Sequence, residues 1–440
     1  MKPESVFPSY PEYKDSGVEW LGNVPSHWEI WRAWALLVER NDFSLNGQEA
    51  LLSVSEYYGV KPRTEVKRED EFDSRAESLE GYRICRVGDF VMNYMLAWKG
   101  SHGVTNYEGI VSPAYAVFRF IGVQEPSYFH NLLRTPTICA EFRRFSSGII
   151  DSRLRLYPED FLHQIKLPIP PLPEQQAIAN FLDQETVKID TLIAKQERLI
   201  ALLTEKRQAV ISHAVTKGLN PSAARKESGV EWLGDVPSHW EVKAIKRQYS
   251  VVGGSTPKSE EPDFWDGDIQ WVTPADIGKL SASYIGESQR KITFAGLQSC
   301  SASLVPSDSL IVSTRAPIGS IAIAQSELCF NQGCKALVPT NKTACTRFCY
   351  YVFSITTQAL NTLGKGTTFL ELSADALSSF VVPCPSFPEQ QAIAAFLDQE
   401  TAKIDTLIEK AKQSIELMKE RRSALISAAV TGKIDVRKVV

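Results

Sequence analysis

The sequence of 440 residues lacks any segment that points to a membrane or to secretion. No apolar run approaches the ~18 residues that a membrane-spanning helix requires. The first residues, MKPESVFPSYPEYKDSG, contain no apolar stretch that could act as a secretory signal. We therefore expect a cytoplasmic protein. With 43% hydrophobic and 23% charged residues its composition is that of a globular protein, and its length predicts two or more domains.

Motifs for catalysis are also missing. The chain has neither the glycine-rich loop nor the Asn/Asp-Pro-Pro-Tyr motif of a methyltransferase, and no G-x-S-x-G elbow of a hydrolase. The segment LGKGTT (363–368) has Gly366 where a P-loop needs Ser or Thr. The Glu-x-Lys tripeptides at 65–67 and 241–243 lack the upstream Pro-Asp pair of a metal-dependent nuclease. These absences favour a binding or adaptor protein over an enzyme.

The chain has no excess of basic charge and no compact cysteine motif. Residues 1–170 hold 19 Lys and Arg against 23 Asp and Glu, and residues 221–385 hold 14 against 15. This balance argues against nonspecific coating of nucleic acid but leaves room for a local basic face. The cysteines at 329, 334, 345 and 349 lack C-x2-C pairs and a nearby histidine. Reduced thiols are therefore favoured over a zinc site, and we expect no bound metal.

Two segments occur twice. SGVEWLGNVPSHWE (16–29), which we call the tryptophan box, returns at 228–241 with only Asn23 replaced, by Asp235. PEQQAIANFLDQETVKIDTLI (173–193) returns at 388–408 with two replacements, Asn180 by Ala395 and Val187 by Ala402. The chain is therefore box, variable region and helix, followed by the same series again. The presence of His27 and His239 in both boxes favours a structural role beside Trp28 and Trp240.

The second repeat predicts a long helix in each half. A proline-rich entry precedes Glu174, which suits the positive end of a helix, and Gly218 and Pro221 supply a stop. Apolar residues at spacings of three and four continue for roughly 45 residues. An antiparallel pair within one chain is favoured, and a coil between two chains is the alternative. The predicted apolar stripe comprises Phe181, Leu182, Ile189, Leu192, Leu199, Leu203, Phe396, Leu397, Ile404, Leu407, Met418 and Leu425.

Each variable region predicts an α/β domain. Strands are expected within 82–94, 109–122, 308–316 and 319–324, and helices over 127–145 and 345–360, each followed by a glycine-bearing turn and a last strand. The predicted class is α+β, with two α/β domains separated by two long antiparallel helices that act as a coiled-coil spacer in an internal pseudo-twofold repeat. The expected boundaries are 1–166 and 221–381 for the domains, and 167–220 and 382–440 for the helices.

The doubled pattern GVEWLG-(N/D)-VPSHWE, variable region and LPxPPxPEQQAIAxFLDxET-x-KID-x-LI closely resembles the specificity subunits of type I restriction-modification systems, over essentially the whole chain. LLSVSEYYGVKPRTE (51–65) and the segment 253–277 resemble the openings of that family's target-recognition domains. The resemblance implies a non-catalytic subunit whose two domains each read half of a bipartite, asymmetric target in double-stranded DNA. The helices would set the gap and dock the modification subunits.

The resemblance also implies partners and cofactors. Two modification subunits would bind S-adenosylmethionine and methylate adenine N6. In a full restriction complex, two restriction subunits would add ATP- and Mg²⁺-dependent translocation and cleavage. This chain itself would bind no cofactor. Two other classes stay open: a self-contained enzyme with duplicated catalytic domains, and a protein-interaction scaffold that never meets DNA.

DNA contacts are expected from basic residues in loop-like positions, because phosphates and guanine edges favour Lys and Arg. Any one of these residues could instead be an ordinary surface charge. Arg315 and Lys365 are the stronger candidates, since the small residues around them would let the backbone approach DNA closely. The full set is Lys99, His102, Arg153 and Arg155 in the first domain, and Lys258, Arg315, Lys335 and Lys365 in the second.

Overall fold

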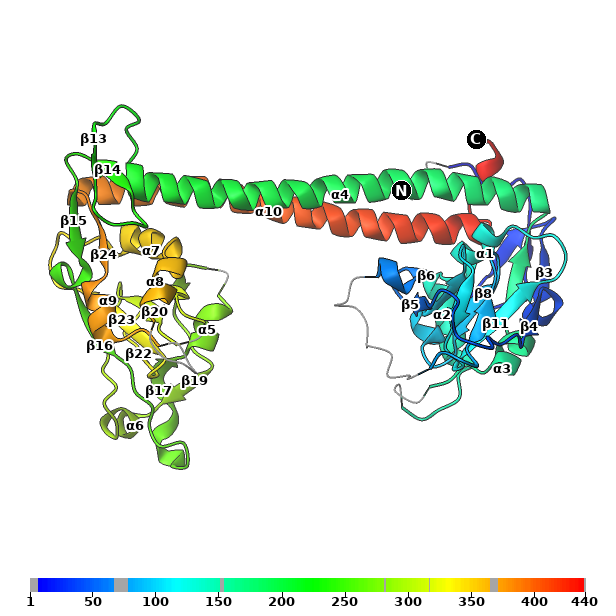
Figure 1. Ribbon diagram of the computed structural model, residues 1–440, viewed down its shortest axis with the longest axis horizontal. Coiled ribbons are helices and arrows are strands. Elements are labelled where there is room, and N and C mark those ends of the chain that lie inside the picture. Colours follow the sequence, from blue (N-terminus) through cyan, green and yellow to red (C-terminus); the bar gives the residue numbers. More distant parts are fainter. Residues whose placement is uncertain are drawn as a thin grey trace. The chain divides into compact units, whose positions relative to one another are not determined.

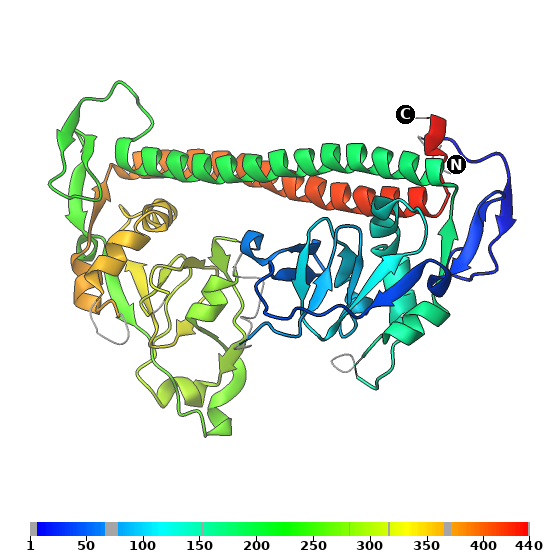
Figure 2. The ribbon, with the colours of Figure 1, turned by 45° about the vertical axis from the view of Figure 1, so that its right-hand side comes forward.

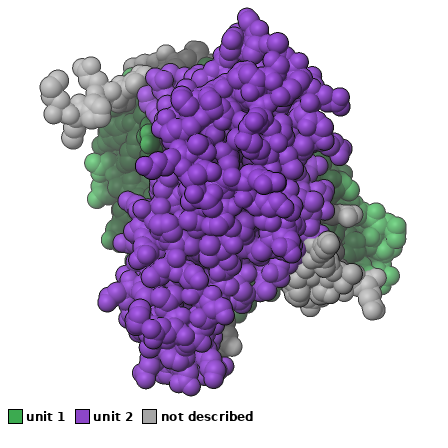
Figure 3. All heavy atoms as spheres, turned by 90° about the vertical axis from the view of Figure 1, so that its left-hand side faces the viewer, with its two compact units in different colours: residues 1–196, 413–440 green, residues 197–412 purple. Residues whose placement is uncertain are grey.

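The computed structural model describes residues 7–66, 78–150, 154–280, 282–315, 317–364 and 371–438. The chain forms two compact units, which Figure 3 colours separately. Unit 1 contains residues 1–196 and 413–440, and unit 2 contains residues 197–412. Each unit therefore takes one end of both long helices together with one of the two variable regions. No helix among the described residues is long and apolar enough to cross a membrane.

The main sheet of unit 1 is antiparallel, with strand order β4-β11-β8-β9. Four two-stranded ladders, β1-β2, β12-β3, β5-β6 and β10-β7, surround it. The strands are β1 (Tyr13–Asp15), β2 (Asn23–Pro25), β3 (Glu29–Arg32), β4 (Leu37–Arg40), β5 (Leu52–Ser55), β6 (Gly59–Pro62), β7 (Arg83–Cys85), β8 (Phe90–Asn93), β9 (His102–Val104), β10 (Gly109–Val111), β11 (Tyr115–Phe120) and β12 (Lys166–Ile169).

Unit 1 also contains three short helices, of which the first lies beside the end of the long helix α10 (Phe387–Val430) and the last lies far from the long helices (Figure 1). They are α1 (Pro126–Leu133), α2 (Pro136–Arg144) and α3 (Pro158–Gln164). The helix expected over 127–145 is thus two helices. Pro136 cannot continue α1 because it lacks an N–H group, and the Thr135 side chain instead caps α2 by accepting from the Ile138 N–H. The 3-10 helices are η1 (Ala33–Ala35), η2 (Arg63–Glu65), η4 (Ala97–Lys99) and η8 (Val436–Lys438).

Unit 2 repeats this layout with a larger variable region. Its sheets have the orders β16-β23-β20-β21-β18 and β19-β17-β22, with the ladders β13-β14 and β15-β24. The strands are β13 (Arg225–Glu227), β14 (Asp235–Pro237), β15 (Glu241–Ala244), β16 (Tyr249–Gly253), β17 (Trp265–Val272), β18 (Tyr284–Ile285), β19 (Arg290–Ile292), β20 (Leu310–Ser313), β21 (Ile321–Ala324), β22 (Cys329–Phe330), β23 (Cys334–Pro339) and β24 (Val381–Cys384).

The helices of unit 2 are again short apart from the long pair. They are α5 (Pro274–Gly278), α6 (Phe294–Gln298), α7 (Thr346–Ser354), α8 (Thr357–Leu363) and α9 (Ala374–Ser379), with the 3-10 helices η6 (Ile245–Arg247) and η7 (Pro262–Phe264). The helix expected over 345–360 is also two helices, α7 and α8. The last expected strands are present as β12 and β24, but each follows a short helix, α3 or α9, that the sequence reasoning missed.

The two long helices are α4 (Leu172–Lys217) and α10 (Phe387–Val430), and they pack antiparallel, as Figures 1 and 2 show. In unit 1 the Arg422 guanidinium donates to the Asp190 carboxylate at 2.9 and 3.3 Å. In unit 2 Arg207 donates to Asp405 at 2.8 and 3.3 Å. These four residues are equivalent in the sequence repeat. The α+β class and the antiparallel helix pair within one chain are confirmed.

Candidate functional site

In unit 1 the tryptophan box is bound to the first turn of α4. Glu174 is 5% exposed, and its carboxylate accepts hydrogen bonds from the Trp28 indole N–H at 2.9 Å and from the Tyr10 hydroxyl at 2.5 Å. The His27 Nε2 lies 2.7 Å from the same carboxylate. Trp28 is fully buried, and its apolar surface alone stabilises this contact by about 2–3 kcal/mol. The box is therefore the clamp for the N-terminus of the helix.

Unit 2 repeats the clamp with the equivalent residues. The Trp240 indole donates to Glu389 at 2.9 Å, and the His239 Nε2 lies 3.1 Å from that carboxylate. Trp240 is also fully buried. The structural role expected for both histidines is thus seen as a contact with the glutamate of the repeated PEQQ segment. The two repeated segments bind each other, once in each unit, and we call each contact a box–helix junction.

A glycine from the end of the opposite long helix completes each junction. Gly432, at φ +71°, follows α10 in unit 1, and a Cβ there would lie 2.3 Å from Pro25 of the first box. Gly218, at φ +74°, follows α4 in unit 2, and a Cβ there would lie 3.2 Å from the Trp240 ring. Only glycine allows both the left-handed turn and this close approach. Each box therefore holds the ends of both helices.

The first glutamine of the PEQQ segment ties the variable region to the same helix end. The Gln175 amide donates to the Pro170 carbonyl at 2.9 Å and accepts from the Glu125 N–H, just before α1, at 3.0 Å. Gln390 donates to the Pro385 carbonyl at 2.9 Å and accepts from the Cys345 N–H, just before α7, at 3.0 Å. The same two bonds thus place α1 and α7 equivalently on their long helices, although the two helices share little sequence.

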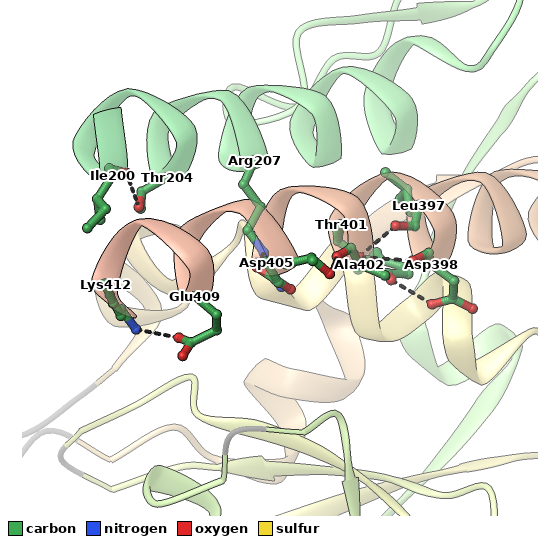
Figure 4. A network of polar contacts seen from close by, with 12 residues as sticks. Ile200, Thr204, Arg207, Leu397, Asp398, Thr401, Ala402, Asp405, Glu409 and Lys412 are labelled. Atoms are coloured by element: carbon green, nitrogen blue, oxygen red, sulfur yellow. Dashed lines mark hydrogen bonds and ion pairs between the residues drawn. The ribbon is translucent and has the colours of Figure 1, made fainter. Parts of the chain in front are cut away.

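Beside the junction of unit 2, a polar cleft of about 420 Å³ lies between the variable region and the long helices. Arg207 and Asp405 line it, and Figure 4 shows Arg207 reaching from α4 to Asp405 on α10. About two turns earlier on α10, Asp398 accepts from the Arg347 Nε at 2.7 Å and from the Tyr351 hydroxyl at 2.6 Å. The Arg347 guanidinium also stacks on the rings of Tyr284, Tyr350 and Tyr351. This ion pair fastens α7 to α10.

The equivalent cleft of unit 1 lacks this fastening. Asp183 corresponds to Asp398 in the repeat, but Ser127 and Asn131 stand where unit 2 has Arg347 and Tyr351. Burial, together with the nearby Glu125 carboxylate, raises the pKa of Asp183. A polar cavity of about 240 Å³ lined by Ser127, Asn131 and Asp183 occupies this place. The two units therefore differ in how firmly the variable region is held at this point.

The predicted apolar stripe of the long helices divides into two faces. The buried members are Phe181, Leu182, Ile189, Leu203, Leu397, Ile404 and Leu425, and Met418 packs partly buried against the core. Leu192, Leu199, Phe396 and Leu407 are instead 47%, 43%, 38% and 50% exposed, so their assignment to the seam is corrected. An ideal α-helix drifts by ~20° per heptad, so a strict heptad count departs from the true seam over the roughly six heptads of each helix.

The exposed leucines lie on the face of the helix pair that points away from the variable regions. Leu192 follows Asp190 by two residues, and Leu417 precedes Arg422 by five. Because each residue turns a helix by about 100°, these leucines point about 200° and 140° away from the Asp190–Arg422 ion pair, which faces the cleft. Leu417 is 65% exposed. In unit 2 the equivalent residues, Leu407 and Leu202, are 50% and 45% exposed. Each unit thus presents the same pair of leucines to solvent.

Four of the residues predicted to contact DNA are at least partly accessible. Lys99 is exposed, with its ammonium 5.2 Å from the centre of the Trp98 ring, and Lys258 is exposed in the segment before η7. Arg315 is 46% exposed and pairs with Glu371 at 3.2 Å. Arg155 is half-buried, and its guanidinium donates to the Leu154 carbonyl. Their contact with DNA stays a prediction. Arg153 and Lys365 lie outside the described residues.

Two of the predicted contacts need correction. His102 is fully buried in β9 between Phe90 and Phe142, and its Nε2 lies 2.9 Å from the Leu133 carbonyl oxygen. Lys335 is 8% exposed, and its ammonium donates to the Leu372 carbonyl at 2.8 Å. Neither side chain reaches a surface that DNA could touch. The glycines around both residues suggested loops, whereas the structure has strands there.

Three of the four cysteines that lie close together in the sequence are buried thiols, and Cys345 is partly exposed. Burial raises the pKa of Cys329, Cys334 and Cys349 to about 12, which disfavours the thiolate that a metal would bind. Within the described ranges, no three His, Cys, Asp or Glu side chains are grouped as they would be around a metal ion.

Several interacting residues were not singled out from the sequence. Gln175 and Gln390 lie inside the repeated PEQQ segment, and their identity in both copies was a usable signal. Arg347 had no such signal, because its partner Asp398 lies 51 residues away and its counterpart in unit 1 is a serine. Its role follows only from the packing of α7 on α10.

By its fold, the chain comprises two mixed α/β domains, and the same junction fastens each of them to one end of an antiparallel helix pair. Residues 237–417 match the type I restriction modification DNA specificity domain. The MjaIX specificity subunit of a type I restriction enzyme from Methanocaldococcus jannaschii is 36% identical over 190 residues, 43% of each chain. The MjaX specificity subunit of the same organism is 25% identical over 374 residues, 83% of this chain and 82% of that relative.

Solved structures show the same fold. A chain from a study of complex assembly and conformational transition in a type I restriction-modification system superposes with a TM-score of 0.70 at 16% identity, over 92% of this chain and 98% of that one. The match to the first relative spans less than half of either chain, whereas the second relative and the solved structure match across most of their length. Residues 237–417 therefore match the DNA specificity domain of type I restriction-modification systems, and most of the chain is similar in sequence to a specificity subunit of such a system.

Proposed function

We propose that this chain is the DNA-specificity subunit of a type I restriction-modification complex, with each variable region reading one half of a bipartite, asymmetric target. One observation carries the proposal: identical box–helix junctions hold two different domains on one helix pair. Duplicated scaffolds suit DNA because its half-sites repeat along a regular helix. Divergent domains on that scaffold would read different half-sites, so the target need not be palindromic.

The helix pair would serve both as spacer and as docking surface for the modification subunits. Leu192 with Leu417, and Leu407 with Leu202, form two equivalent exposed apolar pairs. Exposed apolar side chains that recur identically in both units suit two copies of one partner. We therefore propose a complex with two modification subunits, and with two restriction subunits where the system also cleaves.

Catalysis would reside in those partners. The modification subunits would bind S-adenosylmethionine, the restriction subunits would use ATP and Mg²⁺, and this chain would bind no cofactor. The proposed location is the cytoplasm, where the DNA and these partners would meet.

Since both variable regions carry slightly more acidic than basic residues, we expect the lone chain to bind DNA weakly. The assembled complex should bind with a steep salt dependence.

The decisive experiment maps methylation in cells that express this chain with its modification subunit. Long-read sequencing for N6-methyladenine should reveal one bipartite motif with a fixed gap. If the subunits assemble, yet neither a motif nor specific DNA binding is found, the proposal fails. Assembly without any DNA binding would instead favour a protein scaffold. Methylation by the purified chain alone would favour the duplicated enzyme.

Single substitutions should separate the two halves of the motif. Arg315→Ala in unit 2 should relax or weaken one half-site, by about 1–3 kcal/mol if the arginine reads a base edge. Lys99→Ala in unit 1 is the reciprocal variant, and its effect should fall on the other half-site. The measurement is the binding of DNAs with one half-site scrambled. Equal weakening for every DNA would indicate a phosphate contact, and no change would remove Arg315 from the interface.

A further inference from the structure

Unit 1 contains a basic cleft between its β5–β6 hairpin, helix α1 and the C-terminal part of α10 (elements labelled in Figure 1). The cleft measures about 550 Å³, and four basic side chains line it: Lys61, Arg134, Lys419 and Arg422. None of the described residues that line it is an aspartate or a glutamate. The only histidine among them, His130, is uncharged at neutral pH, because burial and the Arg134 charge lower its pKa to about 4.

Arg134 brings a positive charge to this cleft that backbone groups alone hold in place. Its guanidinium donates to the carbonyl oxygens of Glu56, Gly100 and His102 at 2.8, 2.8 and 2.6 Å. Carbonyl oxygens satisfy its hydrogen bonds but do not neutralise its charge. Burial and repulsion from Arg422 lower the pKa of Arg134. A half-buried charge without a counter-charge is costly, so an anion in the cleft would stabilise this arrangement.

The other two basic residues stand at the mouth of the cleft. Lys61 is exposed on β6, with its ammonium 5.7 Å from the centre of the Tyr58 ring. Lys419 is exposed on α10 and pairs with Glu416, one turn earlier on the same helix, at 2.9 Å. Such an exposed pair is worth little, so the lysine can turn to a stronger anion at small cost.

Unit 2 offers a built-in comparison, because two of the basic residues of this cleft have uncharged counterparts there. Thr204 stands at the position of Lys419, and its hydroxyl donates to Ile200 within its own helix, as Figure 4 shows. Ser354 stands at the position of Arg134. The charges of Lys419 and Arg134 are therefore present in unit 1 and have no counterpart at the equivalent positions of unit 2.

We propose that the basic cleft of unit 1 binds a phosphate of the DNA backbone next to the half-site that the first domain reads. The proposal rests on the function proposed above and adds an asymmetry to it. Lys61 and Lys419 contact the phosphate at the mouth of the cleft, and Arg134 provides positive potential from its floor, where the neighbouring Arg422 is already paired with Asp190. The first domain thus has a contact with the DNA backbone, beside helix α10, that the second domain lacks.

The test uses the full chain assembled with its modification subunit, on DNA carrying the mapped motif. The variants are Lys61→Ala, Lys419→Ala and the double variant. Lys412→Ala is the matched control, since Lys412 is exposed on the same helix and pairs with Glu409 in the same geometry, at 2.8 Å. Each lost phosphate contact should reduce the slope of log K against log [salt] by about 0.9, with roughly fivefold to tenfold weaker binding near 0.1 M salt. Lys412→Ala should change neither.

Methylphosphonate substitution locates the contact. A neutral linkage at one position beside the first half-site should weaken binding of the wild-type complex, and the same linkage should cost the double variant nothing. If the double variant keeps the wild-type salt slope and methylphosphonate pattern while the wild-type complex still recognises its motif, the cleft proposal is wrong and the proposed function stands. If the wild-type complex recognises no motif at all, the proposed function itself fails.

Discussion

His102 is a buried histidine whose surroundings keep it neutral. Its ring lies 5.1 Å from the Phe142 ring, and its Nε2 lies 2.9 Å from the Leu133 carbonyl oxygen. Burial, together with the Arg134 charge, lowers its pKa to about 3. In the unfolded chain the same imidazole takes up a proton near pH 6.5. At the residue scale, folding therefore excludes a proton that the unfolded chain would bind.

This difference predicts a loss of stability in acid. Between the two pKa values the unfolded state holds more protons than the folded one, so the free energy of unfolding falls as the pH drops. The expected contribution is about 1.4 kcal/mol for each pH unit below ~6. Urea unfolding of the wild type and of His102→Gln, measured between pH 7.5 and 5, should show a shallower pH dependence in the variant. Parallel curves would contradict the prediction.

At the scale of elements, the box–helix junctions are equal in sequence but not in burial. The Glu174 carboxylate has 5% of its side chain exposed and accepts from Tyr10 as well as Trp28. The Glu389 side chain is 27% exposed, and its indole partner is Trp240. The difference comes from the residues around Tyr10, which pack only against the first junction.

The two glutamates should therefore differ in their contribution to stability. Glu174→Ala leaves the buried Trp28 N–H and Tyr10 hydroxyl without their acceptor and should cost about 3 kcal/mol, whereas Glu389→Ala should cost about 1 kcal/mol. Gln176→Ala, at an exposed position of the same helix turn, should be nearly neutral. Urea denaturation of the three variants gives the comparison. Equal losses at the two glutamates would show that Tyr10 adds nothing to the first junction.

At the scale of the whole molecule, two equivalent leucine pairs predict two equivalent docking events. Leu192→Lys with Leu417→Lys should remove one modification subunit from the complex, and Leu407→Lys with Leu202→Lys should remove the other. A charged side chain in a buried apolar contact is strongly unfavourable, so each loss should be close to complete. Native mass spectrometry of the co-expressed complex reports the stoichiometry directly.

Val187 supplies the control for this experiment. It is 64% exposed on the same helix, but its counterpart in the repeat is Ala402, so it belongs to no duplicated apolar pair. Val187→Lys should leave two modification subunits bound. If all four leucine replacements together also leave both subunits bound, docking uses another surface of the chain.

Much of the scaffold was readable from the sequence because its signals are local. The repeated PEQQ segment, the spacing of apolar residues and the glycine at 218 predicted long helices of roughly 45 residues, and α4 and α10 contain 46 and 44. Duplication separated the constant parts from the variable ones. The same local reading placed strands near β8, β11, β20 and β21, because alternating apolar residues mark a half-buried strand wherever it occurs.

The residues that form the candidate DNA interface were harder to predict from the sequence. Glycines flanking His102 and Lys335 suggested loops, yet both residues are buried in strands. Arg134, which joins two backbone segments beside the basic cleft, has no sequence signal at all. A polar side chain can be buried when a carbonyl or carboxylate from a distant part of the chain accepts its hydrogen bond. Neighbouring residues in the sequence do not identify that partner.

The sequence by itself determined the doubled organisation and the long helices, because repeats, helical periodicity and capping residues act within a few turns of chain. Only the tertiary structure decided which leucines face solvent, that each box clamps the ends of both helices, and that basic side chains from distant segments line one cleft beside α10 in unit 1. Those properties arise where segments far apart in the chain pack together, and the free energy of such packing depends on geometry that no single segment encodes.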